Sequence, residues 1–233
     1  MAVPAVTLGS GKSMPRIGFG TATATLGQVE DAIVKVAVLH ALDAGYRHFD
    51  TASAYNTEAA LGDALAEAVR DGKIASRDEV FVTSKFWITD AHPGRVLPAL
   101  QKTVQNLQTE YVDLYLIHHP ISMKPQAGEV GALVVKENLV AMDMKGVWEE
   151  MECQRQGLAK AIGVSNFSCR KLEYVLSFAK IPPAANQVNF VWNKGTPWGN
   201  GSVLDSPVLK EIAQNRGKTV AQVFLSTITL LDY

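Results

Sequence analysis

The stretch HFDTASAY, residues 48–55, contains the first polar residues that bear on the fold. A short apolar run ends at Asp50, and Tyr55 follows five residues later among small residues. A carboxylate at the end of a strand, with a phenol on the loop beyond it, is typical of the face where parallel strands end. The same pattern, an apolar run that ends in polar residues, recurs along the chain.

Short runs rich in Val, Ile, Phe and Leu alternate with longer stretches of helical period, as in successive βα units. The predicted strands are residues 17–21, 47–52, 80–85, 112–118, 161–166 and 185–190. The predicted helices are residues 29–44, 57–70, 94–108, 147–156, 168–179, 206–216 and 219–229, and Thr57 is the predicted cap of the second. Strict alternation predicts an α/β fold with a parallel sheet and outer helices. Residues 120–146 are predicted to be a long functional loop.

The composition favours a globular protein that binds small molecules. With 47% hydrophobic and 19% charged residues, a chain of 233 residues can bury a sizeable core within one domain. The net charge of -1 argues against nucleic acid or acidic membrane as partners. Two cysteines are too few for a disulfide framework and fit a reducing, cytoplasmic location. The sequence shows no basic leader and no continuous run of 18 apolar residues, so neither export nor a membrane span is predicted.

The polar residues that end the predicted strands are the candidate site: Asp50, Lys85, His118, Ser165, Asn166 and Gln187. In a closed parallel barrel such strand ends share one face, where active sites are built. Tyr55 would face Lys85, whose ammonium favours the phenolate and lowers the pKa of the phenol. Asp50 would keep Lys85 charged, and His118 would donate to a carbonyl oxygen. Singly, these residues read as a structural ion pair and a surface aromatic; together they predict protonation of a carbonyl while a cofactor supplies hydride.

Two amides and a hydroxyl end the last two predicted strands. Ser165, Asn166 and Gln187 are of the types required to hold a nicotinamide carboxamide in one orientation. His118 and His119 do not predict a metal site, because adjacent residues on a strand point to opposite faces. The expected cofactor is therefore an organic hydride carrier.

Several motifs in the correct order resemble the aldo-keto reductase family. They are GFGT (18–21), FDTASAY (49–55), SKFW (84–87), DLYLIHHP (113–120), AIGVSNF (161–167) and NQV (186–188). The resemblance runs almost unbroken from about residue 6 to residue 188. It is strongest to the plant branch of the family, which reduces ketones and aldehydes of specialised metabolism.

The resemblance implies a (β/α)8 barrel of the TIM-barrel type, after a short N-terminal hairpin, that reduces a carbonyl substrate with NADPH as a monomer. It implies a catalytic tetrad of Asp50, Tyr55, Lys85 and His118, with Tyr55 as proton donor. The cofactor-binding residues that it implies are Thr21, Asp50, Ser165, Asn166 and Gln187. The substrate-pocket residues that it implies are Trp87 and His119.

The resemblance breaks after about residue 192. One αβ segment of roughly 30 residues, the eighth strand and the basic cluster that recognises the 2'-phosphate of NADP have no counterpart. Residues 1–233 are therefore predicted to form one incomplete barrel domain with about six of the eight strands. An open arc exposes two sheet edges, which predicts self-association. The alternatives are a catalytically silent variant that binds partners through these edges and an unstable fragment without function.

Overall fold

Six apolar runs form one parallel sheet in the computed structural model, which describes residues 4–23, 29–125, 136–154, 157–188 and 207–220. The strands are β3 (Phe19–Gly20), β4 (His48–Asp50), β5 (Phe81–Phe86), β6 (Val112–Ile117), β9 (Ala159–Ser165) and β10 (Asn186–Gln187). They pair in chain order, each parallel to the next, so β3 and β10 form the edges within the described residues. The six predicted strands are confirmed as a half-barrel, consistent with an incomplete (β/α)8 barrel, although most are shorter than predicted.

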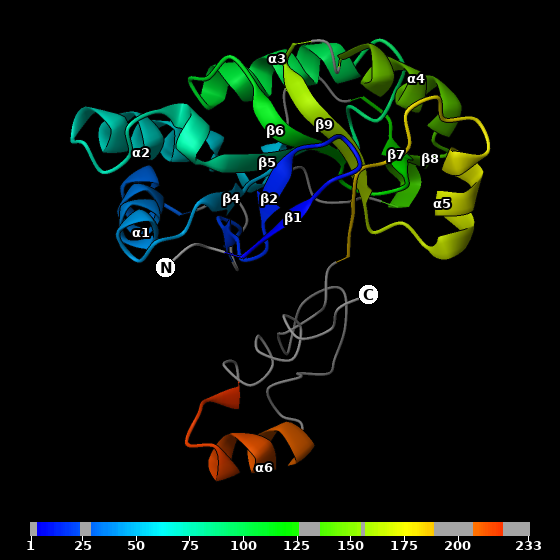
Figure 1. Cartoon of the computed structure of the whole chain (residues 1–233). Coiled ribbons are helices and arrows are strands. Elements are labelled where there is room, and N and C mark those ends of the chain that lie inside the picture. Colours follow the sequence, from blue (N-terminus) through cyan, green and yellow to red (C-terminus); the bar gives the residue numbers. More distant parts are fainter. Residues whose placement is uncertain (1–3, 24–28, 126–135, 155–156, 189–206, 221–233) are drawn as a thin grey trace. The chain divides into compact units, whose positions relative to one another are not determined.

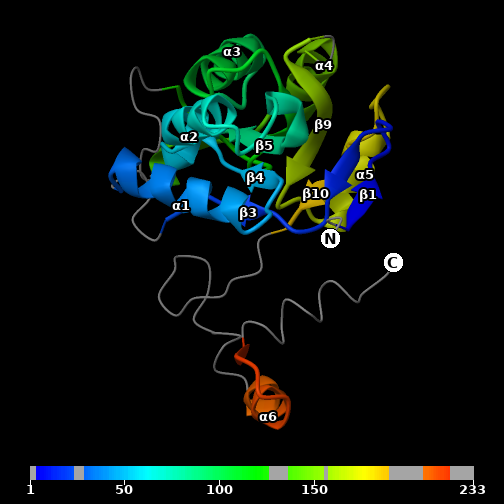
Figure 2. The ribbon, with the colours of Figure 1, turned by 60° about the vertical axis from the view of Figure 1, so that its left-hand side comes forward.

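One helix follows each of the first five strands of this sheet along the chain. They are α1 (Asp31–Asp43), α2 (Glu58–Arg70), α3 (Val96–Asn106), α4 (Met144–Gln154) and α5 (Cys169–Leu176). Figures 1 and 2 show α1 to α4 side by side along the outer face of the sheet, in chain order. The outer core joins sheet residues such as Phe49 and Val82 to helix residues such as Leu61 and Trp148, all buried.

Both faces of the central strands are buried, so exposure does not distinguish inward from outward side chains. The residues that each side chain contacts do distinguish them. All residues of β5 and β6 are buried. The inward set includes Phe81, Leu114, Leu116 and Ala161, which cluster with Leu8. Leu8 lies between β1 (Ala5–Thr7) and β2 (Ser13–Pro15), the antiparallel hairpin that the family resemblance implied. The hairpin therefore covers part of the inner face of the sheet through Leu8.

The predicted loop of residues 120–146 contains regular structure at both ends. β7 (Ser122–Met123) pairs antiparallel with β8 (Leu139–Val140), after η3 (Lys136–Asn138), and α4 begins within the predicted loop at Met144. Ser122 Oγ donates to the Ala91 carbonyl at 2.6 Å, which fixes β7 to the loop that follows β5. Two-residue strands are too short for a periodicity test, so the sequence could not reveal them. Residues 126–135 lie outside the described residues.

The contact pattern divides the chain at residue 188 into two units. The second unit contains α6 (Pro207–Asn215), whose bounds agree closely with those of the predicted helix 206–216. The predicted helix 219–229 and the end of the predicted strand 185–190 fall almost wholly outside the described residues. No helix in the described ranges combines the length and the apolar character that a membrane span requires.

Candidate active site

Strand register brings the predicted tetrad to one end of the sheet. Asp50 is the last residue of β4, and Lys85 stands four residues after inward-facing Phe81 on β5, hence on the same face. His118 directly follows β6, two residues beyond inward-facing Leu116. Parallel strands put these exits on the same side of the arc, because they all run in one direction.

Lys85 is the most buried of the four tetrad residues, with 1% of its surface exposed. Its Nζ donates to Asp50 Oδ1 at 2.6 Å and to the Thr51 carbonyl at 2.9 Å. A buried ammonium is retained only where an opposite charge and further acceptors compensate for lost water. The predicted Asp50–Lys85 pair is present, and the Thr51 carbonyl is an acceptor that the sequence did not indicate.

Tyr55 ends the short helix η1 (Ser53–Tyr55) and is almost completely buried. The left-handed conformation of Asn56, with φ of 54°, turns the chain from η1 toward α2. The Lys85 Nζ lies 4.9 Å from the centroid of the phenol ring. Burial raises the pKa of Tyr55 above its usual value of 10, and Lys85 opposes this through its charge and hydrogen bonding. The predicted net lowering of this pKa is therefore wrong, because the loss of water outweighs the ammonium.

His118 packs between two aromatic rings. Its ring centroid lies 5.5 Å from that of Tyr55 and 5.0 Å from that of Trp87, both edge to face. Burial, followed by the charge of Lys85, lowers the pKa of His118 to about 2, so the imidazole is neutral near pH 7. Its Nδ1 is buried, as is Trp87 Nε1, and neither has a hydrogen-bond partner among the described residues.

His118 and His119 lie on the same side of the chain, contrary to prediction. Their rings stack in parallel, with centroids 4.7 Å apart and planes 7° apart. β6 ends at Ile117, so the alternation that holds within a strand does not extend to these two residues. His119 also meets Trp87 edge to face at 5.6 Å, which places both predicted pocket residues beside His118. Burial, followed by Lys85, lowers the pKa of His119 to about 4.

The predicted carboxamide-binding residues are neighbours at the exits of β9 and β10. Asn166 Nδ2 donates to Ser165 Oγ at 3.0 Å and to the His118 carbonyl at 3.1 Å. Ser165 Oγ donates to the Gln187 carbonyl at 2.8 Å. Gln187 Nε2 crosses the arc and donates to Asp50 Oδ2 at 2.9 Å. The Ser165 hydroxyl and the Asn166 carboxamide are in contact, and the Gln187 carboxamide follows at the next strand exit; these groups are donors and acceptors of the kind that suits a nicotinamide carboxamide.

Thr21, the remaining predicted cofactor residue, lies just after β3 and is buried. Its N–H and its hydroxyl donate to the Asp50 carbonyl at 2.9 and 3.2 Å. Its hydroxyl also lies 2.7 Å from Thr57 Oγ1, and Thr57 in turn lies 3.1 Å from Thr51 Oγ1. Thr57 precedes α2 as predicted, but its side chain makes no capping hydrogen bond. Thr51 and Thr57 are therefore site residues that the sequence reading missed, although both stand within ten residues of Asp50.

Metal-binding side chains do not gather in this site. Within the part of the chain that the structure describes, no group of three or more His, Cys, Asp or Glu residues could hold a metal ion. The site combines a phenol beside an ammonium, a neutral imidazole, and amides of the kind that bind a carboxamide.

The sequence matches the profile of the Aldo/keto reductase family over residues 16–193, and the chain belongs to this family. It is 55% identical to deoxymugineic acid synthase 1-B of Triticum aestivum, over 91% of this chain and 74% of the relative. It is 48% identical to NADPH-dependent codeinone reductase 1-4 of Papaver somniferum, over 95% and 76%. These matches confirm the expected likeness to the plant branch.

A solved structure, the aldo-keto reductase of Bombyx mori in complex with NADP, is also similar to this chain. It superposes with a TM-score of 0.82 and 31% identity, over 97% of this chain and 80% of the other. The fold assignment is confirmed by this neighbour, and NADP is its bound cofactor. The alignments to the two plant enzymes span 238 and 247 residues, more than the 233 of this chain, so they include positions without a counterpart here.

Proposed function

We propose that this chain reduces a ketone or aldehyde to an alcohol, with hydride from NADPH and a proton from Tyr55. The observation that carries the proposal is the buried Lys85 ammonium, bonded to Asp50 and set against the Tyr55 ring. Family membership and the NADP complex of the Bombyx mori enzyme support the same reaction. The substrate class is a small-molecule carbonyl compound.

Tyr55 begins the reaction as a neutral phenol, since burial raises its pKa. It gives its proton to the carbonyl oxygen as negative charge develops there. Lys85 then stabilises the phenolate that remains, and this attraction is strong because the ammonium is shielded from water. The charge thus contributes after proton transfer more than before it, which is the property required of a catalytic interaction.

His118 is the second group that faces the reacting oxygen. A neutral imidazole carries one N–H, which donates to the carbonyl oxygen and orients it. The low pKa of His118 keeps it from acting as the proton donor, so that role stays with Tyr55. Trp87 and His119 pack on this imidazole and would form the wall of the substrate pocket that selects substrates by shape.

NADPH, when bound, supplies the hydride. Ser165, Asn166 and Gln187 would hold its carboxamide, and they are already in mutual contact. The Gln187 amide donates to Asp50 Oδ2, so this residue joins the cofactor side to the proton-donating side. Thr21 holds the backbone of Asp50 through its N–H and hydroxyl.

The test is NADPH binding, followed by turnover, on the purified chain. Quenching of tryptophan fluorescence reports binding, and Trp87 lies within the site. We expect saturable binding in the micromolar range and a loss of NADPH absorbance that depends on added aldehyde or ketone. Cooperatively folded protein that binds no NADPH would overturn the proposal.

A second candidate function is that of a catalytically silent partner that pairs through its sheet edges. Its support is the exposure of Val188, 56%, directly after edge strand β10, together with the relatives' unmatched positions. This second candidate also assumes that one αβ segment is missing from the barrel. Sedimentation of the wild type against Val188→Lys tests it, because a charge on the edge would weaken pairing. A monomeric chain with normal turnover would contradict this second candidate, and only the reductase function would remain.

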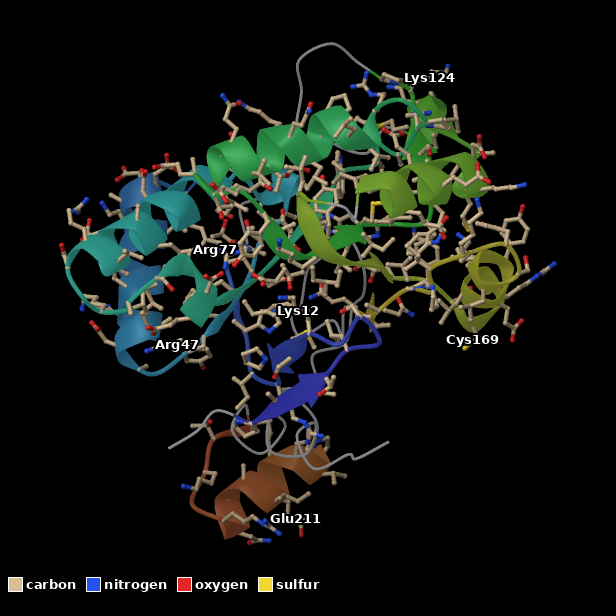
Figure 3. All side chains as sticks on the ribbon, turned by 45° about the horizontal axis from the view of Figure 1, so that its top comes forward. Lys12, Arg47, Arg77, Lys124, Cys169 and Glu211 are labelled. Atoms are coloured by element: carbon tan, nitrogen blue, oxygen red, sulfur yellow. The ribbon has the colours of Figure 1, made fainter. Side chains whose placement is uncertain are left out.

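We also infer a cytosolic location. The support is the cysteine usage: of two cysteines, Cys169, labelled in Figure 3 at the start of α5, is an exposed free thiol. Fractionation of cells that express a tagged chain tests the inference, and recovery in a membrane or secreted fraction would contradict it.

A further inference from the structure

Three buried threonine hydroxyls form a chain beneath Asp50. Thr21 follows β3, Thr51 follows β4, and Thr57 precedes α2; each is at most 4% exposed. Thr57 Oγ1 lies at the centre, 2.7 Å from Thr21 Oγ1 and 3.1 Å from Thr51 Oγ1. Thr21 Oγ1 also reaches the Asp50 carbonyl at 3.2 Å. The hydroxyls thereby connect three separate elements at one point of the site.

The direction of this chain follows from the chemistry of its last acceptor. A carbonyl oxygen only accepts, so the Thr21 hydroxyl donates to Asp50. A hydroxyl has one proton, so Thr57 must donate to Thr21, and Thr51 must donate to Thr57. Thr57 therefore both accepts and donates within the chain, and its hydroxyl makes no capping hydrogen bond to α2.

Both ends of the hydroxyl chain belong to residues that hold the Lys85 ammonium. Asp50 binds it through Oδ1, and Thr51 binds it through its backbone carbonyl. The hydroxyl chain adds a tie between these residues and β3, an edge strand of only two residues. The Lys85 ammonium in turn lies against the Tyr55 ring. A shift of the β4 exit would therefore move the ammonium relative to the phenol.

We propose that Thr57 is a positioning residue for the proton-donating tetrad, acting through Thr21 and Thr51 on the Asp50–Lys85 pair. The proposal rests on the proposed reductase function. Thr57 touches neither the ammonium nor the carboxylate; it fixes the backbone from which both contacts are made. The hydroxyl of Thr57, rather than its volume, is the feature that matters.

The test compares Thr57→Val, which removes the hydroxyl at similar volume, with Thr57→Ser, which keeps it. We expect kcat to fall about 10- to 100-fold in Thr57→Val, because a small displacement of a catalytic group has such an effect. The KM for NADPH should stay unchanged, and Thr57→Ser should restore kcat to within a few-fold. Thr103→Val is the matched control: Thr103 is equally buried, on α3, and its hydroxyl takes no part in the hydroxyl chain.

A second readout does not depend on activity. The Thr21 N–H donates to the Asp50 carbonyl, so its hydrogen exchange reports whether β3 is held on β4. We expect faster exchange in Thr57→Val, and wild-type exchange in Thr57→Ser and Thr103→Val. An inactive wild type would refute the reductase function, and the exchange data would still judge the hydroxyl chain. Wild-type kcat and exchange in Thr57→Val, or equal losses in Thr57→Ser or Thr103→Val, would overturn the proposal.

Discussion

The two sides of the strand exits are held in different ways. On the side of β4 and β5, the Lys85 ammonium is bound by an opposite charge and by a backbone carbonyl, within the buried interior. On the side of β9 and β10, Asn166 Nδ2 donates to Ser165 Oγ and to the His118 carbonyl, and Ser165 Oγ donates to the Gln187 carbonyl. The first side is complete without a ligand. On the second side, we propose that the donors exchange partners when a carboxamide binds.

This difference matters for what each side contributes. Preorganised charges act on a reaction without a cost of rearrangement at the moment of proton transfer. Exchangeable hydrogen bonds contribute little net free energy, because one partner replaces another. We therefore expect substitutions on the β4–β5 side to change the rate strongly, and substitutions on the β9–β10 side to change cofactor affinity modestly.

The largest effect is expected from Tyr55→Phe. The substitution removes the proton donor but keeps the ring that packs edge to face on His118. Because a positioned acid contributes about 10²- to 10⁴-fold, kcat should fall by that factor. Steady-state turnover measures the fall, and NADPH binding by fluorescence should be unchanged. Turnover near the wild-type rate would show that another group supplies the proton.

Lys85→Met should reduce both the rate and the stability. Without the ammonium, the phenolate is not stabilised, and Asp50 Oδ1 loses its charged partner. We expect a fall in kcat of about 10²-fold and a decrease of about 1–3 kcal/mol in the free energy of unfolding. Urea unfolding and turnover measure the two effects. The double variant Asp50→Asn/Lys85→Met, which leaves no unpaired charge, should recover stability but no activity; recovery of activity would contradict the assigned role of Lys85.

The sequence sufficed to predict the strands and the proximity of the four tetrad residues, because both follow from local patterns. Short, mainly apolar runs predict β5 and β6, and polar residues at their exits must share one face in a parallel sheet. The proximity of Ser165, Asn166 and Gln187 was predictable for the same reason, and their binding of a carboxamide stays a prediction. These features need only the order of elements along the chain.

What the sequence did not predict depends on contacts across the fold. Thr21 and Thr57 are 36 residues apart, and their hydrogen bond requires the register of β3 on β4. The stacking of His118 on His119 depends on the residue at which β6 ends. The direction of the Tyr55 pKa depends on how far burial outweighs a neighbouring charge, which only the packed structure decides.

The pH dependence of stability sharpens the contrast at His118. Burial, followed by Lys85, lowers the pKa of His118 from 6.5 to about 2 in the folded state. Between these values the unfolded chain binds the extra proton, so stability is fully present above pH 6.5 and falls as the pH drops below it. From pH 7 to pH 5 we expect His118 to account for a loss of about 2 kcal/mol.

Urea unfolding at several pH values measures this loss. His118→Gln, which cannot take up a proton, should flatten the fall in stability toward low pH. His40→Gln, at an exposed site on α1, is the control and should not flatten it. An equal slope in the wild type and in His118→Gln would mean that the imidazole is hydrated and free to protonate in the folded state.

The smallest effect is expected on the cofactor side, from Gln187→Ala. The substitution removes a predicted carboxamide contact and the hydrogen bond to Asp50 Oδ2. Asp50 keeps its charged bond to Lys85, so the tetrad stays in place and kcat should change little. A single hydrogen bond of about 1 kcal/mol corresponds to a rise of roughly 10-fold or less in the KM for NADPH.

Initial rates at varied NADPH measure this change, with Gln101→Ala on the exposed surface of α3 as the matched control. The opposite result, a large fall in kcat with an unchanged KM, would assign Gln187 to the proton-donating side. Its bond across the arc to Asp50 would then be part of the preorganised network, because the carboxylate would need both of its partners to hold Lys85 against Tyr55. The exchangeable side would in that case be confined to the exit of β9, with Ser165 and Asn166.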